Sequence, residues 1–171
     1  MGLSQTPQAL VPAAFTAGSM TLLSTTSLSG TTVTISSISQ SYKHLYFEVF
    51  GCTSTTANGS YRVSMGGAKG RGFSDNDALN ANLNPIQLGA GSEPLRTNAD
   101  NFWGITIFDY ASTANFKGFI ISGAWTDTGS VTRGGFVAGG CPTNTAISSL
   151  VFTQGSGHSY STGTVRIYGV N

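Results

Sequence analysis

The sequence predicts an all-β protein, an antiparallel β-sandwich of the jelly-roll type preceded by an extended N-terminal arm. About nine short segments alternate apolar and polar residues with the period of two that strands require. Turns rich in glycine, asparagine and serine separate these segments, and no segment keeps apolar residues at helical spacing over three turns. The 171 residues are enough for one domain that buries about 70% of its unfolded surface.

The strongest of these strands lies within residues 101–112, which have the sequence NFWGITIFDYAS. Trp103, Ile105 and Ile107 point to one side of such a strand, whereas Phe102 and Phe108 point to the other. Because both sides carry large apolar groups, we expect this strand to be covered on both faces. We expect its side chains to build the scaffold and to take no part in catalysis.

The remaining predicted strands surround this central one along the chain. Residues 57–59 (Ala-Asn-Gly) form a strong hairpin signal within this series. The segments are 18–24, 31–37, 42–51 and 60–65 before the central strand, and 116–124, 131–138, 147–153 and 163–170 after it. The sandwich domain therefore spans residues 18–171.

Two segments lack this alternation. Residues 1–17 contain Pro7 and Pro12 and no charge, which favours an extended arm. Residues 74–100 are rich in asparagine and predict a long loop with room for a helical turn at 77–83. Because long loops in compact domains are often functional, the arm and this loop are the predicted contact surfaces.

Charge is scarce, since only 9% of residues are charged and the net charge is +1. Nucleic acids and anionic membranes need basic clusters, so neither is an expected partner. The N-terminal segment has no signal-peptide pattern and no stretch is long enough to span a bilayer, so we expect cytosolic synthesis. A neutral surface of hydroxyls and amides is typical of a protein that packs against other proteins.

The sequence does not predict an enzyme. His44 and His158 occur without a nucleophile motif, and together with Cys52 and Cys141 they lack the paired spacing of a zinc site. The two cysteines are expected to be reduced, buried and unpaired. Residues 75–77 resemble the start of a calcium loop, but Asn80 replaces its glycine and Ile86 replaces its glutamate. No cofactor or metal is expected.

Two further features suggest binding. Residues 66–72 are rich in glycine and predict a flexible hairpin tip, where Lys69 or Arg71 would meet an acidic partner. Trp125 stands beside a loop and could stack on a sugar, although packing is the more common use of such a tryptophan.

Three groups of residues together resemble a family. Residues 22–39 form a Ser/Thr-rich hairpin that leads into Tyr-Lys-His-Leu at 42–45, the middle carries Asp109 and Tyr110 followed by Phe116 and Lys117, and residues 163–170 close the chain. This arrangement is similar to small virion proteins of tailed bacteriophages. The resemblance implies a β-sandwich component of a phage particle, either a capsid decoration (cement) protein or a tail-fibre protein, and it implies no catalytic residue.

From these observations we expect a capsid decoration protein that stabilises the assembled head by binding it. It would be made in the host bacterial cytoplasm, reside in the virion, form a homotrimer and contact the major capsid protein. The expected partner-binding residues are Leu3, Leu10, Val11, Phe15, Lys69, Arg71, Leu83, Ile86 and Leu88. The alternative is a tail-fibre or receptor-binding module in which Trp125 and Tyr160 bind a host surface glycan.

Overall fold

The computed structural model describes residues 20–55, 60–66, 69–74, 80–83, 86–88, 101–127, 129–155 and 157–171, with only the backbone described in 69–74 and 80–83. These residues form twelve strands and no helix. The strands are β1 (Thr21–Ser27), β2 (Thr32–Ile35), β3 (His44–Ser54), β4 (Tyr61–Ser64), β5 (Lys69–Ser74), β6 (Asn80–Leu83), β7 (Ile86–Leu88), β8 (Phe102–Ile107), β9 (Lys117–Thr126), β10 (Thr132–Cys141), β11 (Leu150–Gln154) and β12 (Tyr160–Val170).

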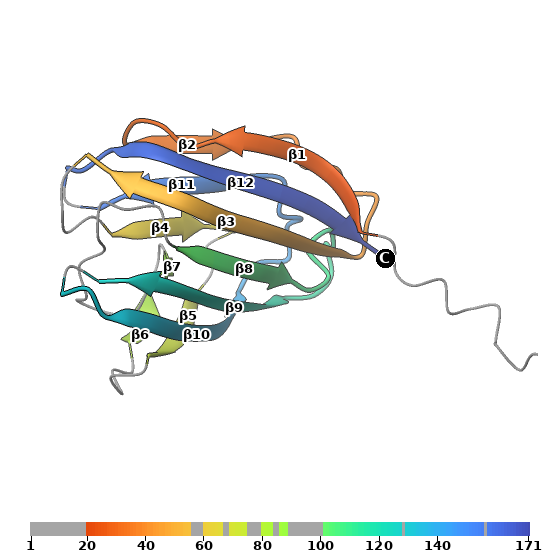
Figure 1. Ribbon diagram of the computed structural model, residues 1–171. Coiled ribbons are helices and arrows are strands. Elements are labelled where there is room, and N and C mark those ends of the chain that lie inside the picture. Colours follow the sequence, from red (N-terminus) through yellow and green to blue (C-terminus); the bar gives the residue numbers. More distant parts are fainter. Residues whose placement is uncertain are drawn as a thin grey trace, which may run out of the picture.

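The strands build two sheets that pack face to face (Figure 1). The larger sheet has eight strands in the order β1-β12-β3-β8-β9-β10-β5-β6, and the smaller has four in the order β2-β11-β4-β7. Every pairing between neighbouring strands is antiparallel. The predicted antiparallel β-sandwich is therefore confirmed.

The core lies between the sheets, and alternate residues of each strand enter it. The rings of Phe47 from the larger sheet and Phe152 from the smaller meet edge to face, with their centroids 6.0 Å apart. Trp103 and its partners on β8 are buried as predicted, but Phe102 on the opposite side is 44% exposed. The expectation that both faces of this strand are covered is therefore wrong, because no described layer packs on its outer side.

Three short strands occupy the region that the sequence assigned to a hairpin tip and a long loop. β5 includes residues 69–72 and pairs with β10, while β6 and β7 lie inside residues 74–100. The expected helical turn at 77–83 is contradicted over Asn80–Leu83, which is strand β6. β5 and β6 are too polar to show alternation and β7 has only three residues, so backbone pairing with neighbouring strands defines all three. The predicted arm at 1–17 lies outside the described residues.

Candidate interaction face

The outward side chains of β1, β12, β3, β8, β9 and β10 form one continuous surface, here called the outer sheet face. Strand register places residues from all six strands in a single row across it. The row consists of Leu22, Tyr168, Tyr46, Thr106, Ile120 and Ala138. Side chains from distant parts of the chain thus share one face.

Large hydrophobic side chains are exposed on this face. Leu22 is 52% exposed, Phe102 44%, Phe136 43% and Ile120 38%, and Phe108 at the end of β8 is 39% exposed. Several large apolar side chains exposed on one face of a sheet suggest a site of interaction.

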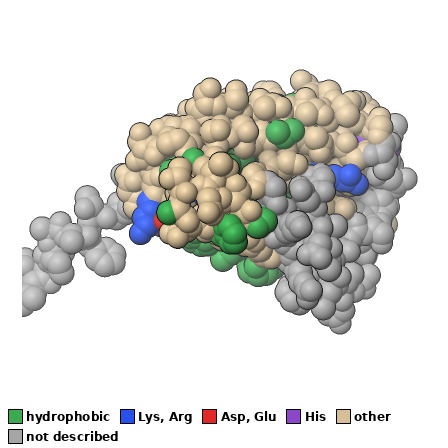
Figure 2. All heavy atoms as spheres, turned by 180° about the vertical axis from the view of Figure 1, so that it is seen from behind, with side chains coloured by type: hydrophobic (Ala, Val, Ile, Leu, Met, Phe, Trp, Pro, Cys, Tyr) green, Lys and Arg blue, Asp and Glu red, His purple; other side chains and the backbone are tan. Residues whose placement is uncertain are grey.

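The smaller sheet offers an internal comparison. Its outer side carries a row of polar residues, namely Thr32, Thr153, Arg62 and Gln87. Figure 2 looks at the molecule from behind, where uncharged polar groups and backbone make up most of the described surface and hydrophobic side chains gather on a smaller part of it. Because one sheet of this sandwich has a polar exterior, the apolar exterior of the other is not a requirement of the fold.

Two glycines of the larger sheet lie beside aromatic rings of the outer sheet face. A Cβ at Gly104 would stand 3.0 Å from the Tyr46 hydroxyl oxygen and 3.7 Å from Cε1 of Phe102. A Cβ at Gly118 would stand 3.8 Å from Cδ2 of Phe108. The Tyr46 hydroxyl thus lies close to the Gly104 backbone, whereas the Phe102 and Phe108 rings are at ordinary contact distance from the glycine positions.

A small polar group interrupts the apolar surface. The Tyr168 hydroxyl donates to Oε2 of Glu48 at 3.5 Å, and the rings of Tyr46 and Tyr168 lie 5.9 Å apart. Partial burial raises the pKa of Tyr46, and the negative charge of Glu48 raises it further. Arg166, the strand partner of Glu48, lies over the Phe50 ring at 4.9 Å from its centroid. One negative and one positive group thus leave this part of the face neutral.

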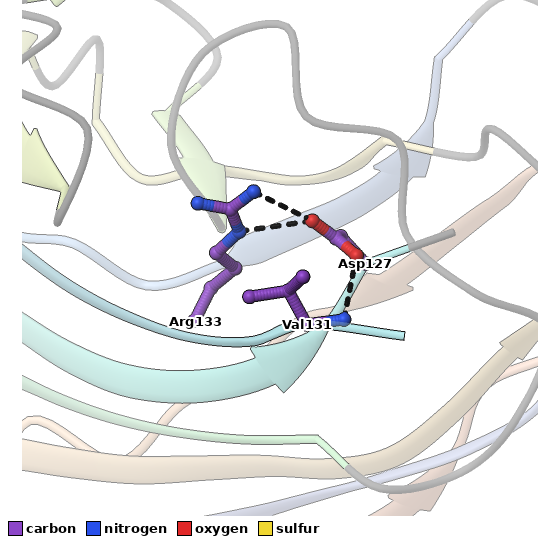
Figure 3. A network of polar contacts seen from close by, with 3 residues as sticks. All are labelled: Asp127, Val131 and Arg133. Atoms are coloured by element: carbon purple, nitrogen blue, oxygen red, sulfur yellow. Dashed lines mark hydrogen bonds and ion pairs between the residues drawn. The ribbon is translucent and has the colours of Figure 1, made fainter. Parts of the chain in front are cut away.

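The hairpin between β9 and β10 is held by a carboxylate (Figure 3). Oδ1 of Asp127 accepts the Val131 N–H at 2.9 Å, while Oδ2 accepts from Nε and Nη2 of Arg133 at 2.9 and 2.8 Å. These bonds, the backbone bond from Val131 first among them, lower the pKa of Asp127. The result is a fixed turn at the end of β9.

The residues that carry the phage resemblance serve structural roles. The Tyr110 hydroxyl donates to the carbonyl oxygen of Ser39, and Tyr110 is fully buried. Lys117 is 1% exposed, and its Nζ donates to the carbonyl oxygens of Thr143 and Thr145 at 2.9 and 2.8 Å. Both side chains tie connecting segments to the sandwich.

The proposed glycan aromatics are buried, so their assignment as exposed binding residues is wrong. Trp125 is 1% exposed and stacks on Trp103, with ring centroids 6.4 Å apart. Tyr160 is 3% exposed and stacks on Tyr61 at 5.5 Å, and its hydroxyl donates to the Thr153 carbonyl at 3.1 Å. Polar neighbours in the sequence suggested exposure, whereas stacking within the core decides their position.

Two of the predicted partner contacts are corrected in the same way. Ile86 and Leu88 are both 0% exposed on β7, where they contribute to the core instead of to a surface. The backbone places Lys69 and Arg71 on β5, beside β10, and Leu83 on β6. The other four predicted contacts, Leu3, Leu10, Val11 and Phe15, lie outside the described residues.

The outer sheet face is not among the contact surfaces that the sequence predicted. Its signal was present, since Phe102 and Phe108 alternate with Trp103 and Ile107 in one strand. That pattern predicts a strand covered on both sides by its own chain. The same pattern also occurs when another molecule covers the second side.

Neither cysteine offers a reactive thiol. Cys52 and Cys141 are free and fully buried, as the sequence predicted. Burial raises the pKa of Cys52 to about 12, and it raises that of Cys141 to about 11 although Lys117 opposes the shift. Both thiols are therefore protonated at neutral pH, and the thiolate is the reactive form.

Within the described ranges, no three His, Cys, Asp or Glu side chains gather into a potential metal site. That part of the chain also contains no helix suited to crossing a lipid bilayer. Comparisons with protein-family models, curated proteins and solved structures find no match.

Proposed function

We propose that this protein is a structural component of a phage virion that acts by binding, most specifically a capsid decoration protein that docks through its outer sheet face. The observation that carries the proposal is the exposure of Leu22, Phe102, Phe108, Ile120 and Phe136 on one nearly neutral face. The sequence resemblance to small virion proteins of tailed bacteriophages is the reason for proposing a phage particle. Partner binding needs no catalytic group, and the role is non-enzymatic.

The strand pairing supports the finer assignment of the fold as a jelly roll. β1 pairs with β12, β2 with β11, β3 with β8 and β4 with β7. In these four pairs the first strand of the set is joined to the last, the second to the last but one, and so on inward. A long antiparallel hairpin folded over into two sheets gives this pairing, and viral capsid jelly rolls have it. β9 and β10, together with β5 and β6, extend the larger sheet beyond the nested set. The extension enlarges the outer sheet face.

The size of the face lies near the lower limit of a stable protein interface. Six strands about 4.8 Å apart span roughly 25 Å, and seven residues at about 3.3 Å per residue give a similar length. The resulting area of roughly 600 Å² is somewhat below the ~800 Å² that each partner contributes to a standard interface. Binding only the assembled shell would stabilise the shell by mass action.

The partner in this proposal is the major capsid protein, and the protein binds as a homotrimer at a local symmetry axis of the head. The apolar residues of the arm supply a second contact. The virion is then the site of action, and the host bacterial cytoplasm is the site of synthesis.

The decisive experiment locates and counts the chain in purified virions by quantitative mass spectrometry. Hundreds of copies per particle are expected for a decoration protein, and a handful would place it in the tail instead. Absence from the virion would refute the structural role altogether.

A pair of matched variants then tests the face. Ile120→Glu introduces a charge on the outer sheet face, and Thr153→Glu introduces the same charge on the outer side of the smaller sheet. In sedimentation with heads that lack the protein, Ile120→Glu should lower bound copies at least tenfold, because it buries an unpaired charge. Thr153→Glu should bind as wild type. Equal binding by both variants would contradict docking through this face.

Glycan recognition by a tail protein is a second candidate function. Because Trp125 and Tyr160 are buried, it would use other aromatic residues. Tyr46 and Tyr168 present half-buried rings beside the Glu48 carboxylate, a combination of stacking surface and hydrogen-bond acceptor that suits a sugar. Binding of the full chain to host surface glycans, lost in Tyr46→Ala, would favour this function. Wild-type glycan binding by that variant would count against it.

A further inference from the structure

A pocket of about 160 Å³ opens at one side of the sandwich, where the end strands of the two sheets, β1 and β2, run along the same edge (Figure 1). Four aliphatic side chains line the pocket, and four serines complete its wall. The aliphatic residues are Leu23 of β1, Ile35 at the end of β2, Ile38 of the following connection and Ile167 of β12. Because none of the eight lining residues is charged, the pocket suits a neutral, largely apolar group.

Hydrogen bonds fix the part of the wall that follows β2. The N–H of Ile38 donates to the carbonyl oxygen of Ser148 at 3.1 Å, and the Ile38 carbonyl oxygen accepts from the side-chain amide of Gln40 at 2.7 Å. Ser37, which also belongs to the wall, has a left-handed φ of 58°. A serine adopts this conformation at a cost, and proteins keep such strain mostly where a site needs it. The pocket is therefore preformed, so a ligand does not have to order its wall.

A serine at a core position keeps the pocket open. Ser24 is the strand partner of Ile167, which is fully buried, so the Ser24 side chain also faces the interior of the sandwich. A register shift between Leu22 and Ser24 leaves Leu23 without a partner on β12, and Leu23 packs against the edge of the core. Inward positions of a sandwich strand are usually apolar. Leucine at position 24 would therefore fill space that serine leaves open.

The size and the place of the pocket indicate what it binds. A dry protein cavity of about 150 Å³ holds one benzene molecule, whereas sites for small molecules measure about 300–1,000 Å³. The pocket therefore takes one apolar side chain, and a sugar or a cofactor is too large for it. Of the described strands, only β12 pairs with β1, and Thr21–Ser27 contains neither a charge nor a proline to protect this free edge. An extended segment that adds to a sheet edge places its side chains in pockets beside that edge.

We propose that the pocket receives one apolar side chain from an extended segment of a second copy of this protein, which lies along the free edge of β1. The pocket is open in the structure of a single chain, which favours a second copy over the same copy as the source. Residues 1–17 are uncharged, so their burial against this uncharged pocket leaves no unpaired charge. The apolar side chains that this segment offers are those of Leu3, Leu10, Val11 and Phe15.

Such a contact is heterologous, because each copy offers a pocket and donates a segment, and three copies close it into a ring. The inference rests on the proposed function only for this number of copies. Sedimentation velocity of the purified full-length protein tests it without virions or heads, so its failure leaves the copy count in virions unaffected. The wild type should form trimers as its concentration rises. A wild type that stays monomeric at every concentration, as it would if the segment of the same copy filled the pocket, would overturn the proposal.

Ser24→Leu separates binding from folding, because it fills the pocket from within. Its urea midpoint should rise at a concentration where the wild type is monomeric, while its self-association weakens at least tenfold. Ser64→Leu is the matched control, since Ser64 lies on the outer side of the smaller sheet, opposite Val151, and this variant should associate as wild type. A lower midpoint for Ser24→Leu, or wild-type association by it, would overturn the proposal.

A second full-length variant tests the donated segment and leaves the folded domain unchanged. Serine replaces Leu3, Leu10, Val11 and Phe15 together. This variant should keep the urea midpoint that the wild type has as a monomer and lose self-association at least tenfold, because it has no apolar side chain to place in the pocket. Wild-type association by this variant would refute residues 1–17 as the occupant.

Discussion

Replacing Gly123 with alanine should disrupt the largest aromatic cluster of the core. Gly123 is the strand partner of Trp103, and the indole ring lies directly across it. An added Cβ would stand 2.1 Å from Cδ1 and 2.8 Å from Cγ of Trp103, and 2.6 Å from the Phe102 carbonyl oxygen. Real Cβ atoms do not approach other atoms this closely, so the ring or the strand must move.

The cost follows from what holds the ring in place. Trp103 is 1% exposed and packs against Trp125 and Tyr61, so it has no free space to enter. Overpacking of a filled core costs about 1–3 kcal/mol, and each aromatic pair that is disturbed adds about 0.5–1.5 kcal/mol. We expect a loss of about 2–4 kcal/mol in the free energy of unfolding, a large share of the ~5–15 kcal/mol typical of a domain.

Urea unfolding followed by far-UV circular dichroism measures this loss. With a slope of about 2 kcal/mol per molar urea, the midpoint should fall by about 1–2 M. Gly134→Ala on β10 is the control, because its Cβ would meet only the Gly123 carbonyl oxygen at 4.0 Å, and its change should stay within about 0.5 kcal/mol.

A double-mutant cycle isolates the clash. In a Trp103→Leu background the indole ring is absent but the contact with the Phe102 carbonyl oxygen remains, so Gly123→Ala should cost less than in the wild type and still more than Gly134→Ala. Equal effects of Gly123→Ala and Gly134→Ala, or an undiminished cost beside Trp103→Leu, would refute this account of the core.

Two further predictions concern buried polar anchors. Asp127 has a folded pKa below its usual 3.8, so its stabilisation is present above that value and is lost as pH falls through the lower folded pKa. Asp127→Asn should therefore flatten the fall of the urea midpoint on acidification below about pH 4, and an unchanged profile would contradict stabilisation of the fold by the Asp127 carboxylate. Lys117→Met should destabilise the fold by about 1–3 kcal/mol, because the carbonyl oxygens of Thr143 and Thr145 lose their buried donor. Wild-type thermal stability of that variant would contradict the anchoring role.

Much of the scaffold could be predicted from local pattern. The alternating segments 42–51 and 163–170 were predicted as strands, and they overlap the two longest strands, β3 (His44–Ser54) and β12 (Tyr160–Val170). The burial of Trp103 and of both cysteines followed from the same reasoning. Alternation is enough in these cases because a long strand with one buried face must place every second residue inside.

Other features depended on partners far away in the chain. β7 has only three residues, and its sequence context predicts a surface position for Ile86 and Leu88, whereas pairing with β4 places them in the core. Trp125 and Tyr160 looked exposed beside polar loops, yet stacking on Trp103 and Tyr61 buries them. No local pattern records such contacts.

The sequence by itself determined that this protein is an all-β sandwich with a neutral exterior, because period-two alternation and composition are local properties. Only the tertiary structure decided which apolar side chains remain outside. Phe102 and Trp103 are adjacent and similar in hydrophobicity, and they lie on opposite faces because successive side chains of a strand alternate between the two faces of the sheet. The second sheet covers Trp103, whereas no described layer covers Phe102. The candidate interaction face is therefore a consequence of how two sheets pack, and a single strand could not reveal it.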